Sequence, residues 1–289
     1  MSTNRIIPML YHSQEQLAAI IRLEQKCNQF EPIHIKTGIE HLTKKDGDHA
    51  LLYYHGEHLT GLLSWHVTDG NTAQIHAMVH PEHRRQGVFR SLLQRAVKDI
   101  EPLGIQRLSF RIPQGSLAGT KAALTMGAIF DRSEYAMTFS NTVLPSPDPS
   151  GVCLIPALPQ DFEFMVACSS QAFGESEIWT RDYFSQTNEP SRATFVAWAE
   201  NIRVGLIRVN HVNTVTAFIH DFCILPSHQG KGLGQQVLML AVEQLFHQSI
   251  PHIRLSVVTE NERALHLYRN AGFEVTSEYQ YYLLNSVRG

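Results

Sequence analysis

The chain carries the same local pattern twice, about 145 residues apart. In each copy an apolar run ends at a proline, and a glycine-containing loop then leads into apolar residues at helical spacing. The matching positions are Val79 with Ile224, Pro81 with Pro226, Arg84 with Gln229, and Gly87 with Gly232. A constant offset over most of a 289-residue chain indicates two copies of one supersecondary plan, which predicts tandem domains.

A change in composition marks the boundary between the two copies. Residues 141–151 are dense in proline, serine and aspartate, which is typical of a surface linker. The predicted organisation is a first domain over 1–140, a linker over 141–151 and a second domain over 152–289. Each domain is long enough to bury a core of its own.

The repeated pattern is clearest in the second copy. Phe218–Leu225 predicts a strand, Gln229–Gly234 a loop and Val237–Phe246 a helix. The three alternating glycines of the loop allow left-handed backbone angles and close approach of a ligand. Because the loop and the first helical turn offer free N–H groups, this loop is a candidate anion site.

A second block follows directly. Ile253–Thr259 predicts a strand, and a helix is expected between Asn261 and Gly272. The residues that share one face of this helix are Ala264, Leu267 and Tyr268. Asn261 has two interpretations, because its side chain could cap the helix or contact a ligand.

The pattern Gln-x-x-Gly-x-Gly and the later block Asn-x-x-Ala-x-x-Leu-Tyr-x-x-x-Gly-Phe together resemble, in the same order, two signature blocks of the GNAT superfamily of N-acetyltransferases. The resemblance implies an α/β (α+β) fold of two tandem GNAT-like domains, each with a mixed central sheet flanked by helices. It also implies acetyl-CoA as cosubstrate. The tandem arrangement is similar to that of mycothiol synthase, an acetyltransferase of the same superfamily.

The resemblance places coenzyme A in the second copy. Backbone groups where the strand splays from its neighbour would bind the pantetheine and polarise the acetyl carbonyl, and the loop would bind the diphosphate. The residues implied are Cys223, Ile224, Gln229, Gly230, Lys231, Gly232, Leu233, Gly234 and Asn261. No metal is implied.

Tyr268 matches the family tyrosine that gives its proton to the coenzyme A thiolate. A phenol with an ordinary pKa of about 10 is still protonated at neutral pH and can supply that proton. The competing interpretation of Tyr268 is a core aromatic on an amphipathic helix.

The general base has two candidates. His220 is preferred because its pKa suits neutral pH, and Asp221 is the alternative, either orienting the histidine or serving as a structural carboxylate. Strand alternation places His220, Phe222 and Ile224 on one face and Ile219, Asp221 and Cys223 on the other, unless a bulge intervenes. Cys223 could suggest an acyl-enzyme, although a small apolar strand residue explains it equally well.

The first copy departs from the family pattern. It has Phe89 in place of Gly234 and Ala123 in place of Tyr268. We therefore expect the first domain to be a poor catalyst. The residues that would still contact coenzyme A are Val79, Arg84 and Gly87.

Composition excludes several classes of function. The net charge is −3, which gives no electrostatic support for a nucleic-acid partner. No run of 18 apolar residues and no secretory leader is visible, so a cytoplasmic protein without a membrane partner is expected. The four cysteines form no C-x-x-C pair and the histidines no His-Glu-x-x-His motif, so neither a disulfide framework nor a metal site is expected.

These inferences favour an acetyl-CoA-dependent N-acetyltransferase that acts by direct attack in a ternary complex on a primary amine of a small molecule. One alternative is a protein or peptide N-acetyltransferase, and another is a non-catalytic acyl-CoA sensor or scaffold. A monomer and a homodimer both remain open, as does the identity of the amine.

Overall fold

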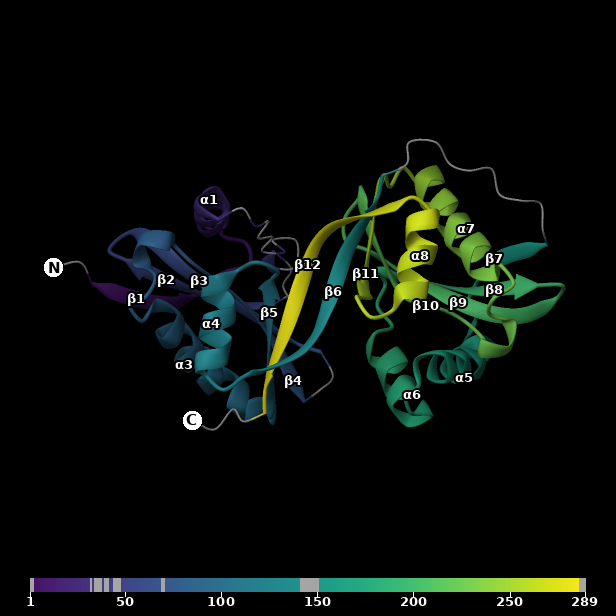
Figure 1. Cartoon of the computed structure of the whole chain (residues 1–289), viewed down its shortest axis with the longest axis horizontal. Coiled ribbons are helices and arrows are strands. Elements are labelled where there is room, and N and C mark those ends of the chain that lie inside the picture. Colours follow the sequence, from purple (N-terminus) through teal and green to yellow (C-terminus); the bar gives the residue numbers. More distant parts are fainter. Residues whose placement is uncertain are drawn as a thin grey trace. The chain divides into compact units, whose positions relative to one another are not determined.

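The structure is a computed structural model that describes residues 3–31, 33, 38, 42–43, 48–68, 71–140 and 151–285 (Figure 1). The first half of the chain contains β1 (Asn4–Pro8), α1 (Gln14–Phe30), β2 (His49–His55), β3 (His58–Val67), β4 (Thr72–Val79), η1 (Pro81–His83), α3 (Val88–Ile100), η2 (Glu101–Leu103), β5 (Arg107–Pro113), α4 (Leu117–Thr125) and β6 (Ile129–Phe139). The second half contains β7 (Val152–Pro156), η3 (Pro159–Asp161), α5 (Phe162–Phe173), α6 (Glu177–Gln186), β8 (Arg192–Ala199), β9 (Ile202–His211), β10 (Thr216–Ile224), η4 (Pro226–His228), α7 (Leu233–His247), β11 (His252–Val258), α8 (Glu262–Asn270) and β12 (Phe273–Leu284). The order of elements repeats, and the predicted tandem α/β fold is confirmed.

The chain divides into two compact units that do not follow chain order. Unit 1 contains the residues up to Ser133 together with those from Ser277 onward, and unit 2 contains Glu134–Thr276. Relative to a division in chain order, the units have exchanged a strand: Tyr279–Leu284 of β12 pairs with β5, and Glu134–Thr138 of β6 pairs with β11. The expected linker lies, except for Gly151, outside the described residues, so the boundary itself stays a prediction.

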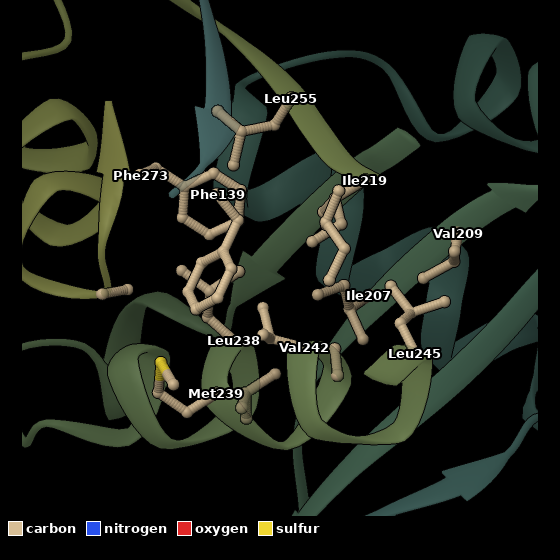
Figure 2. Close-up of a cluster of buried hydrophobic side chains, with 14 of the residues drawn as sticks. Phe139, Ile207, Val209, Ile219, Leu238, Met239, Val242, Leu245, Leu255 and Phe273 are labelled. Atoms are coloured by element: carbon tan, nitrogen blue, oxygen red, sulfur yellow. The ribbon is translucent and has the colours of Figure 1, made fainter. Parts of the chain in front are cut away.

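Unit 2 is built on a mixed sheet whose strands run in the order β6, β11, β10, β9, β8, β7. β10 and β11 are parallel, whereas the other neighbouring pairs are antiparallel. One face of the sheet packs against α7 and α8, in a core that includes Leu238, Val242, Leu245 and Phe273 (Figure 2). The opposite face packs against α5 and α6.

The sequence explains where α7 lies. Its buried residues Val237, Leu238, Ala241, Val242 and Leu245 recur at helical spacing and form one apolar face. The helix begins directly after Gly232, whose φ of 78° requires the left-handed conformation that glycine adopts without strain. The predicted helix is confirmed, and it starts four residues earlier than its apolar pattern indicates.

Unit 1 repeats this plan with strands in the order β1, β2, β3, β4, β5, β12. Helices α3 and α4 contribute to the core on one face, and α1 contributes Ile20, Leu23 and Cys27 to the core on the other. β2 and β3 form an antiparallel hairpin in which residues His49 to His55 are paired.

The described helices include none that is both long and apolar enough to cross a bilayer.

Candidate active site

Strands β10 and β11 pair over a short distance and then separate. Their parallel pairing extends from Thr216 to Ile219 of β10, although β10 continues to Ile224. Beyond Ile219, β10 keeps its partner on the other side, because Cys223 and Ile224 pair with Leu206 and Gly205 of β9. The edge of β10 that faces β11 is therefore released at the residues expected to bind a thioester.

A bulge interrupts β10 at the candidate base. The register with β9 shifts between His220 and Cys223, and Asp221 has a φ of 44°, in the left-handed region that aspartate tolerates better than most residues. His220 lies opposite Arg208, and the Asp221 carboxylate also contacts Arg208. The simple alternation is therefore wrong: the bulge brings His220 and Asp221 to the same face of the sheet.

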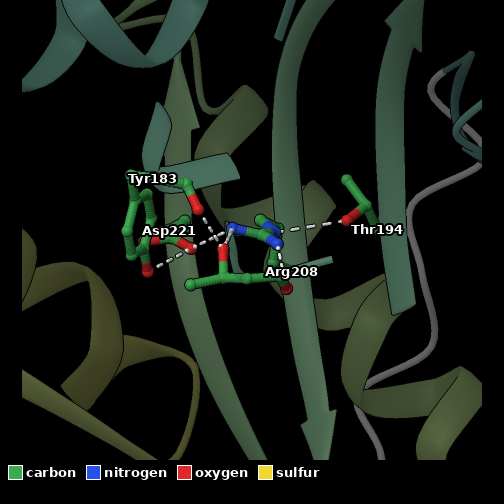
Figure 3. A network of polar contacts seen from close by, with 5 residues as sticks. Tyr183, Thr194, Arg208 and Asp221 are labelled. Carbon is green, nitrogen blue, oxygen red and sulfur yellow. Dashed lines mark hydrogen bonds and ion pairs between the residues drawn. The ribbon is translucent and has the colours of Figure 1, made fainter. Parts of the chain in front are cut away.

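Asp221 belongs to a buried polar network (Figure 3). Both of its carboxylate oxygens accept from the Tyr183 hydroxyl, at 3.2 and 3.0 Å, and Oδ2 also accepts from Arg208 Nη1 at 3.0 Å. Arg208 further donates to Thr187 and Thr194. The network joins α6 to the bulge of β10, so it fixes the backbone directly before Cys223.

Burial shifts the proton affinities of this network. Desolvation, together with the Asp221 charge, raises the pKa of Tyr183 to about 12. Desolvation lowers the pKa of Arg208, and the adjacent Asp221 carboxylate opposes that shift. Since Arg208 is 2% exposed, its charge depends on Asp221 for compensation inside the protein.

The two candidate bases have different surroundings. The His220 ring lies 4.5 Å from the Phe218 ring, at a tilt of 34°. Asp221 already accepts hydrogen bonds from Tyr183 and Arg208 at both oxygens. The geometry therefore favours a positioning role for Asp221 over proton transfer.

Cys223 lies buried at the same place. Its Sγ is 3.8 Å from Sγ of Cys168, and this neighbour, together with desolvation, raises the pKa of the Cys223 thiol well above its ordinary value. A thiol that stays protonated at neutral pH is a weak nucleophile. Cys223 therefore has the properties of a small apolar strand residue rather than of an acyl carrier.

The loop after β10 is shaped by its own side chains. Gln229 Nε2 donates to the carbonyl of Ile224 at 2.9 Å, and Gln229 Oε1 accepts from Arg263 Nη1 at 3.0 Å. Gly230 and Gly232 have φ values of 79° and 78°, as a left-handed turn requires. Gln229, the first residue of the loop, is thus fastened both to the strand and to α8.

The space above this loop is open. A Cβ atom built on Gly232 would meet no atom within 4 Å, and one on Gly230 would meet only Arg263, at 3.8 Å. Gly234 differs, because a Cβ there would lie 2.9 Å from Leu267 Cδ1 of α8. Gly234 therefore permits close packing of α7 on α8, while Gly230 and Gly232 leave room for an anionic ligand.

Tyr268 lies on α8 between aromatic neighbours. Its ring centroid is 6.4 Å from that of Phe222 and 6.1 Å from that of Phe273. Burial, with a smaller contribution from Cys223, raises the pKa of Tyr268 to about 12. Within the described part of the chain, no residue forms a hydrogen bond with its hydroxyl, so the proton is available to an incoming acceptor.

The other loop residues have simpler roles in the structure. Asn261 caps α8, because its Oδ1 accepts from the backbone N–H of Ala264 at 3.1 Å. Lys231 is exposed at the tip of the loop, and Leu233 begins α7. The capping interpretation of Asn261 is therefore confirmed, although capping does not prevent its amide from also meeting a ligand.

Unit 1 has the same loop beside a large cavity. Arg84 Nε donates to the carbonyl of Val79 at 3.1 Å, as Gln229 does to Ile224, and Gly87 has the same left-handed φ as Gly232. A cavity of about 920 Å³ lies there and extends to α4, where Ala123 stands in place of Tyr268. It is walled mainly by apolar residues such as Phe89 and Phe110.

Arg84 is neutralised by Glu31, the residue that directly follows α1. Its guanidinium donates to both oxygens of Glu31, at 2.5 and 3.4 Å, and each side chain is 19% exposed. Arg84 also lies 5.3 Å from the ring centroid of Phe30. Arg84 therefore has an internal counter-charge.

Comparison with known proteins decides the family. The model of the Acetyltransferase (GNAT) family matches residues 17–116 and matches again at residues 161–273. The chain belongs to the Acetyltransferase (GNAT) family.

Two relatives match different shares of the chain. Spermidine N(1)-acetyltransferase of Escherichia coli (strain K12) is 33% identical over 100 residues, which are 33% of this chain and 53% of that protein. The chain thus spans about half the length of this relative. Mycothiol acetyltransferase of Corynebacterium efficiens is 24% identical over 235 residues, which are 75% of each chain.

Solved structures share the fold over nearly the whole chain. A GCN5-related N-acetyltransferase from Sphaerobacter thermophilus superposes with a TM-score of 0.77 at 17% identity, covering 99% of this chain and 96% of the other. A tandem GNAT protein from the clavulanic acid biosynthesis pathway superposes with a TM-score of 0.68 at 18% identity, covering 99% of both chains. At these identities the likeness concerns the fold alone.

The sequence alone did not point to three residues near the candidate site: Tyr183, Arg208 and Arg263. Arg208 carried a signal, because an arginine within the apolar run of β9 requires a buried anionic partner. Tyr183 and Arg263 carried no such signal, because only the folded structure shows that they contact Asp221 and Gln229.

Proposed function

We propose that the protein transfers the acetyl group of acetyl-CoA to a primary amine of a small molecule, and that unit 2 is the catalytic unit. The observation that carries this proposal is the Tyr268 hydroxyl, which has no hydrogen-bond partner among the described residues. Its ring lies 6.4 Å from that of Phe222, on the part of β10 that no longer pairs with β11. In unit 1 the equivalent position is Ala123, which has no proton to give.

Coenzyme A would bind along the released end of β10. We assign its diphosphate to the open glycine loop and its pantetheine to the β10 edge. The residues assigned are Cys223, Ile224, Gln229, Gly230, Lys231, Gly232, Leu233, Gly234 and Asn261. Open space above Gly232 and the exposed Lys231 support this assignment, and Gln229 contributes by holding the Ile224 carbonyl rather than by charge.

The reaction proceeds by direct attack within a ternary complex. The amine nitrogen forms a bond to the acetyl carbon, the carbon–sulfur bond breaks, and the sulfur leaves as a thiolate. Tyr268 gives its proton to that sulfur, the new amide nitrogen loses its surplus proton to solvent, and Tyr268 regains a proton from solvent. Since the pKa of Tyr268 lies near 12, the phenol is fully protonated at neutral pH, and transfer depends on close contact with the thiolate.

A free ammonium must lose a proton before it can attack. His220 is the proposed base, because an imidazole exchanges protons near neutral pH. Asp221 is the proposed positioning residue, since its carboxylate holds Tyr183 and Arg208 and thereby the bulge that carries His220.

The acceptor is proposed to be a small amine in the cytoplasm, bound near the α5–α6 connection. Relatives named for spermidine and for mycothiol support acetylation of small molecules. Trp179 of α6 supports the location, because it is 41% exposed and stacks on Tyr183, with ring centroids 5.2 Å apart. A partly exposed aromatic beside the Asp221 network offers an apolar surface to the carbon chain of an amine.

Unit 1 is proposed to hold coenzyme A without turnover. Val79, Arg84 and Gly87 line its cavity and correspond to Ile224, Gln229 and Gly232 of unit 2. The cavity is consistent with a retained ligand, whereas the absence of a tyrosine at position 123 does not suit catalysis.

A panel of acceptors tests the proposed function. The full-length protein is incubated with acetyl-CoA and with polyamines, amino sugars, aminothiols or a lysine peptide, and free coenzyme A is measured with a thiol reagent. Release that depends on a small amine supports the proposal. Release only with the peptide would favour a protein acetyltransferase, and saturable binding without release under any acceptor would favour a sensor.

A further inference from the structure

Arg263 lies over the glycine loop of unit 2 but comes from a different element. It occupies the second position of α8, directly after the Asn261 cap and Glu262. Its Nη1 donates to Gln229 Oε1 at 3.0 Å, and its Nη2 is the atom that a Cβ on Gly230 would meet, at 3.8 Å. One edge of the guanidinium is therefore committed to Gln229, while the other faces the loop backbone.

Within the loop Gln229–Gly234, the one cationic side chain is Lys231. The Gln229 amide uses both ends, the nitrogen on the Ile224 carbonyl and the oxygen on Arg263. A neutral amide engaged in this way adds little attraction for a dianion. Arg263 supplies the missing charge, and among the described residues no carboxylate lies within ion-pair distance of it.

Unit 1 has the opposite arrangement of charge. Its loop carries two cations: Arg84, which is paired with Glu31, and Arg85, which also lines the cavity of unit 1. The helix position that corresponds to Arg263 is Ala118, counted from the caps Ser116 and Asn261. The two units therefore place their positive charge differently: unit 1 has its arginines in the loop and an alanine on the helix, whereas unit 2 has Lys231 in the loop and Arg263 on the helix.

We propose that Arg263 binds the diphosphate of the coenzyme A thioester, making α8 as well as the loop part of the binding site. This inference rests on the proposed function, because it assumes that the loop of unit 2 takes that ligand. A guanidinium has five donors in a planar fork suited to phosphate oxygens, and the contact with Gln229 occupies only one of them. Gln229 holds the fork toward the loop.

The alternative is that Arg263 only fastens α8 to the loop and thereby positions the Ile224 carbonyl. The two roles differ in what they require of the ligand. A phosphate contact matters only for a thioester that carries phosphates, whereas a positioning role matters equally for acetyl-pantetheine, which lacks them.

The test compares Arg263→Gln with Arg269→Gln, which removes the same charge from the opposite end of α8, where Arg269 is exposed. Binding of coenzyme A and of pantetheine is measured by calorimetry on the full-length protein. Kinetics with acetyl-CoA and acetyl-pantetheine are then measured in the presence of an accepted amine. We expect R263Q to weaken coenzyme A binding by about 10- to 100-fold, as for loss of one charge-assisted contact, and to leave pantetheine unchanged. R269Q should match the wild type with both ligands.

Three results would overturn the inference. They are equal affinities of R263Q and wild type for coenzyme A, an equal loss with pantetheine, and an equal loss in R269Q. If both units bind coenzyme A, calorimetry gives a stoichiometry of two per chain. R263Q should then weaken one of the two sites, that of unit 2, and leave the other unchanged. Binding without acetyl transfer would reject the proposed function while still reporting on Arg263, so the two failures remain distinguishable.

Discussion

Arg208 and Asp221 form an ion pair with 3.0 Å between Nη1 and Oδ2, and the arginine side chain is 3% exposed. Removal of the anion leaves a guanidinium inside the protein without compensation. We expect Asp221→Asn to lower the free energy of unfolding by about 3–5 kcal/mol, which denaturant titration would measure.

An exposed pair provides the control. Glu163 and Arg181 form a bidentate ion pair, but their side chains are 72% and 41% exposed. Glu163→Gln should therefore leave stability nearly unchanged. A loss as large as that of Asp221→Asn would show that burial is not the cause.

Tyr268→Phe removes the proposed proton donor and keeps the ring that packs near Phe222. The turnover number for acetyl transfer should fall about 10²-fold or more, because a positioned general acid contributes that much, while the KM for acetyl-CoA should change little. Steady-state kinetics across several pH values would measure both constants. Unchanged turnover would assign Tyr268 to packing.

Gly205 lies opposite Ile224, and Gly61 lies at the matching place opposite Val79 in unit 1. A methyl group on Gly205 would overlap the carbonyl oxygen of Cys223, which is backbone, whereas one on Gly61 would meet the Val88 side chain at 2.6 Å. Gly205→Ala should therefore cost more stability than Gly61→Ala, and by more than about 1 kcal/mol. Thermal or chemical unfolding of both variants would show the order, and a reversed order would contradict the argument.

Two buried phenols make stability depend on pH in the alkaline range. The pKa values of Tyr183 and Tyr268 are both raised to about 12 from an ordinary value near 10, so folding favours the protonated phenols. Their contribution is fully present below pH 10 and is lost as the pH rises toward 12. We expect the free energy of unfolding to fall across that window, by on the order of 3 kcal/mol from Tyr268 alone, and to fall less in Tyr268→Phe.

The four thiols should differ in reactivity. Burial raises the pKa of Cys27 to about 11 and that of Cys223 well above its ordinary value, and Cys168 is also buried, whereas Cys153 is exposed. Iodoacetamide at neutral pH should alkylate Cys153 first and the other three only after unfolding. Peptide mass spectrometry over time would locate the label, and early modification of Cys223 would contradict its assignment as a protonated strand residue.

The sequence was sufficient to predict the tandem plan, the glycine loops and the helix that carries Tyr268. These features depend on local chemistry, such as left-handed glycines and apolar periodicity, which is visible in a single stretch of residues. The face of the sheet on which Asp221 lies was not predictable in the same way. The bulge that sets it depends on how β9 and α6 position Arg208 and Tyr183 around Asp221.

The exchange of strands was also beyond reach of the sequence. Ser133-Glu134-Tyr135 at β6 and Ser277-Glu278-Tyr279 at β12 are the same tripeptide. Two segments with the same local pattern are equally suited to either sheet edge, so pairing partners are decided only by the complete fold.

That exchange of strands also determines when the sheet of each unit can be completed during translation. The sheet of unit 1 has no edge partner for β5 until residues 279–284 have been translated, whereas unit 2 can receive β6 before its own synthesis is complete. The half of the protein made first therefore finishes last, and a nascent chain arrested anywhere before β12 presents an unpaired β5 edge to whatever chaperone or neighbouring chain it meets.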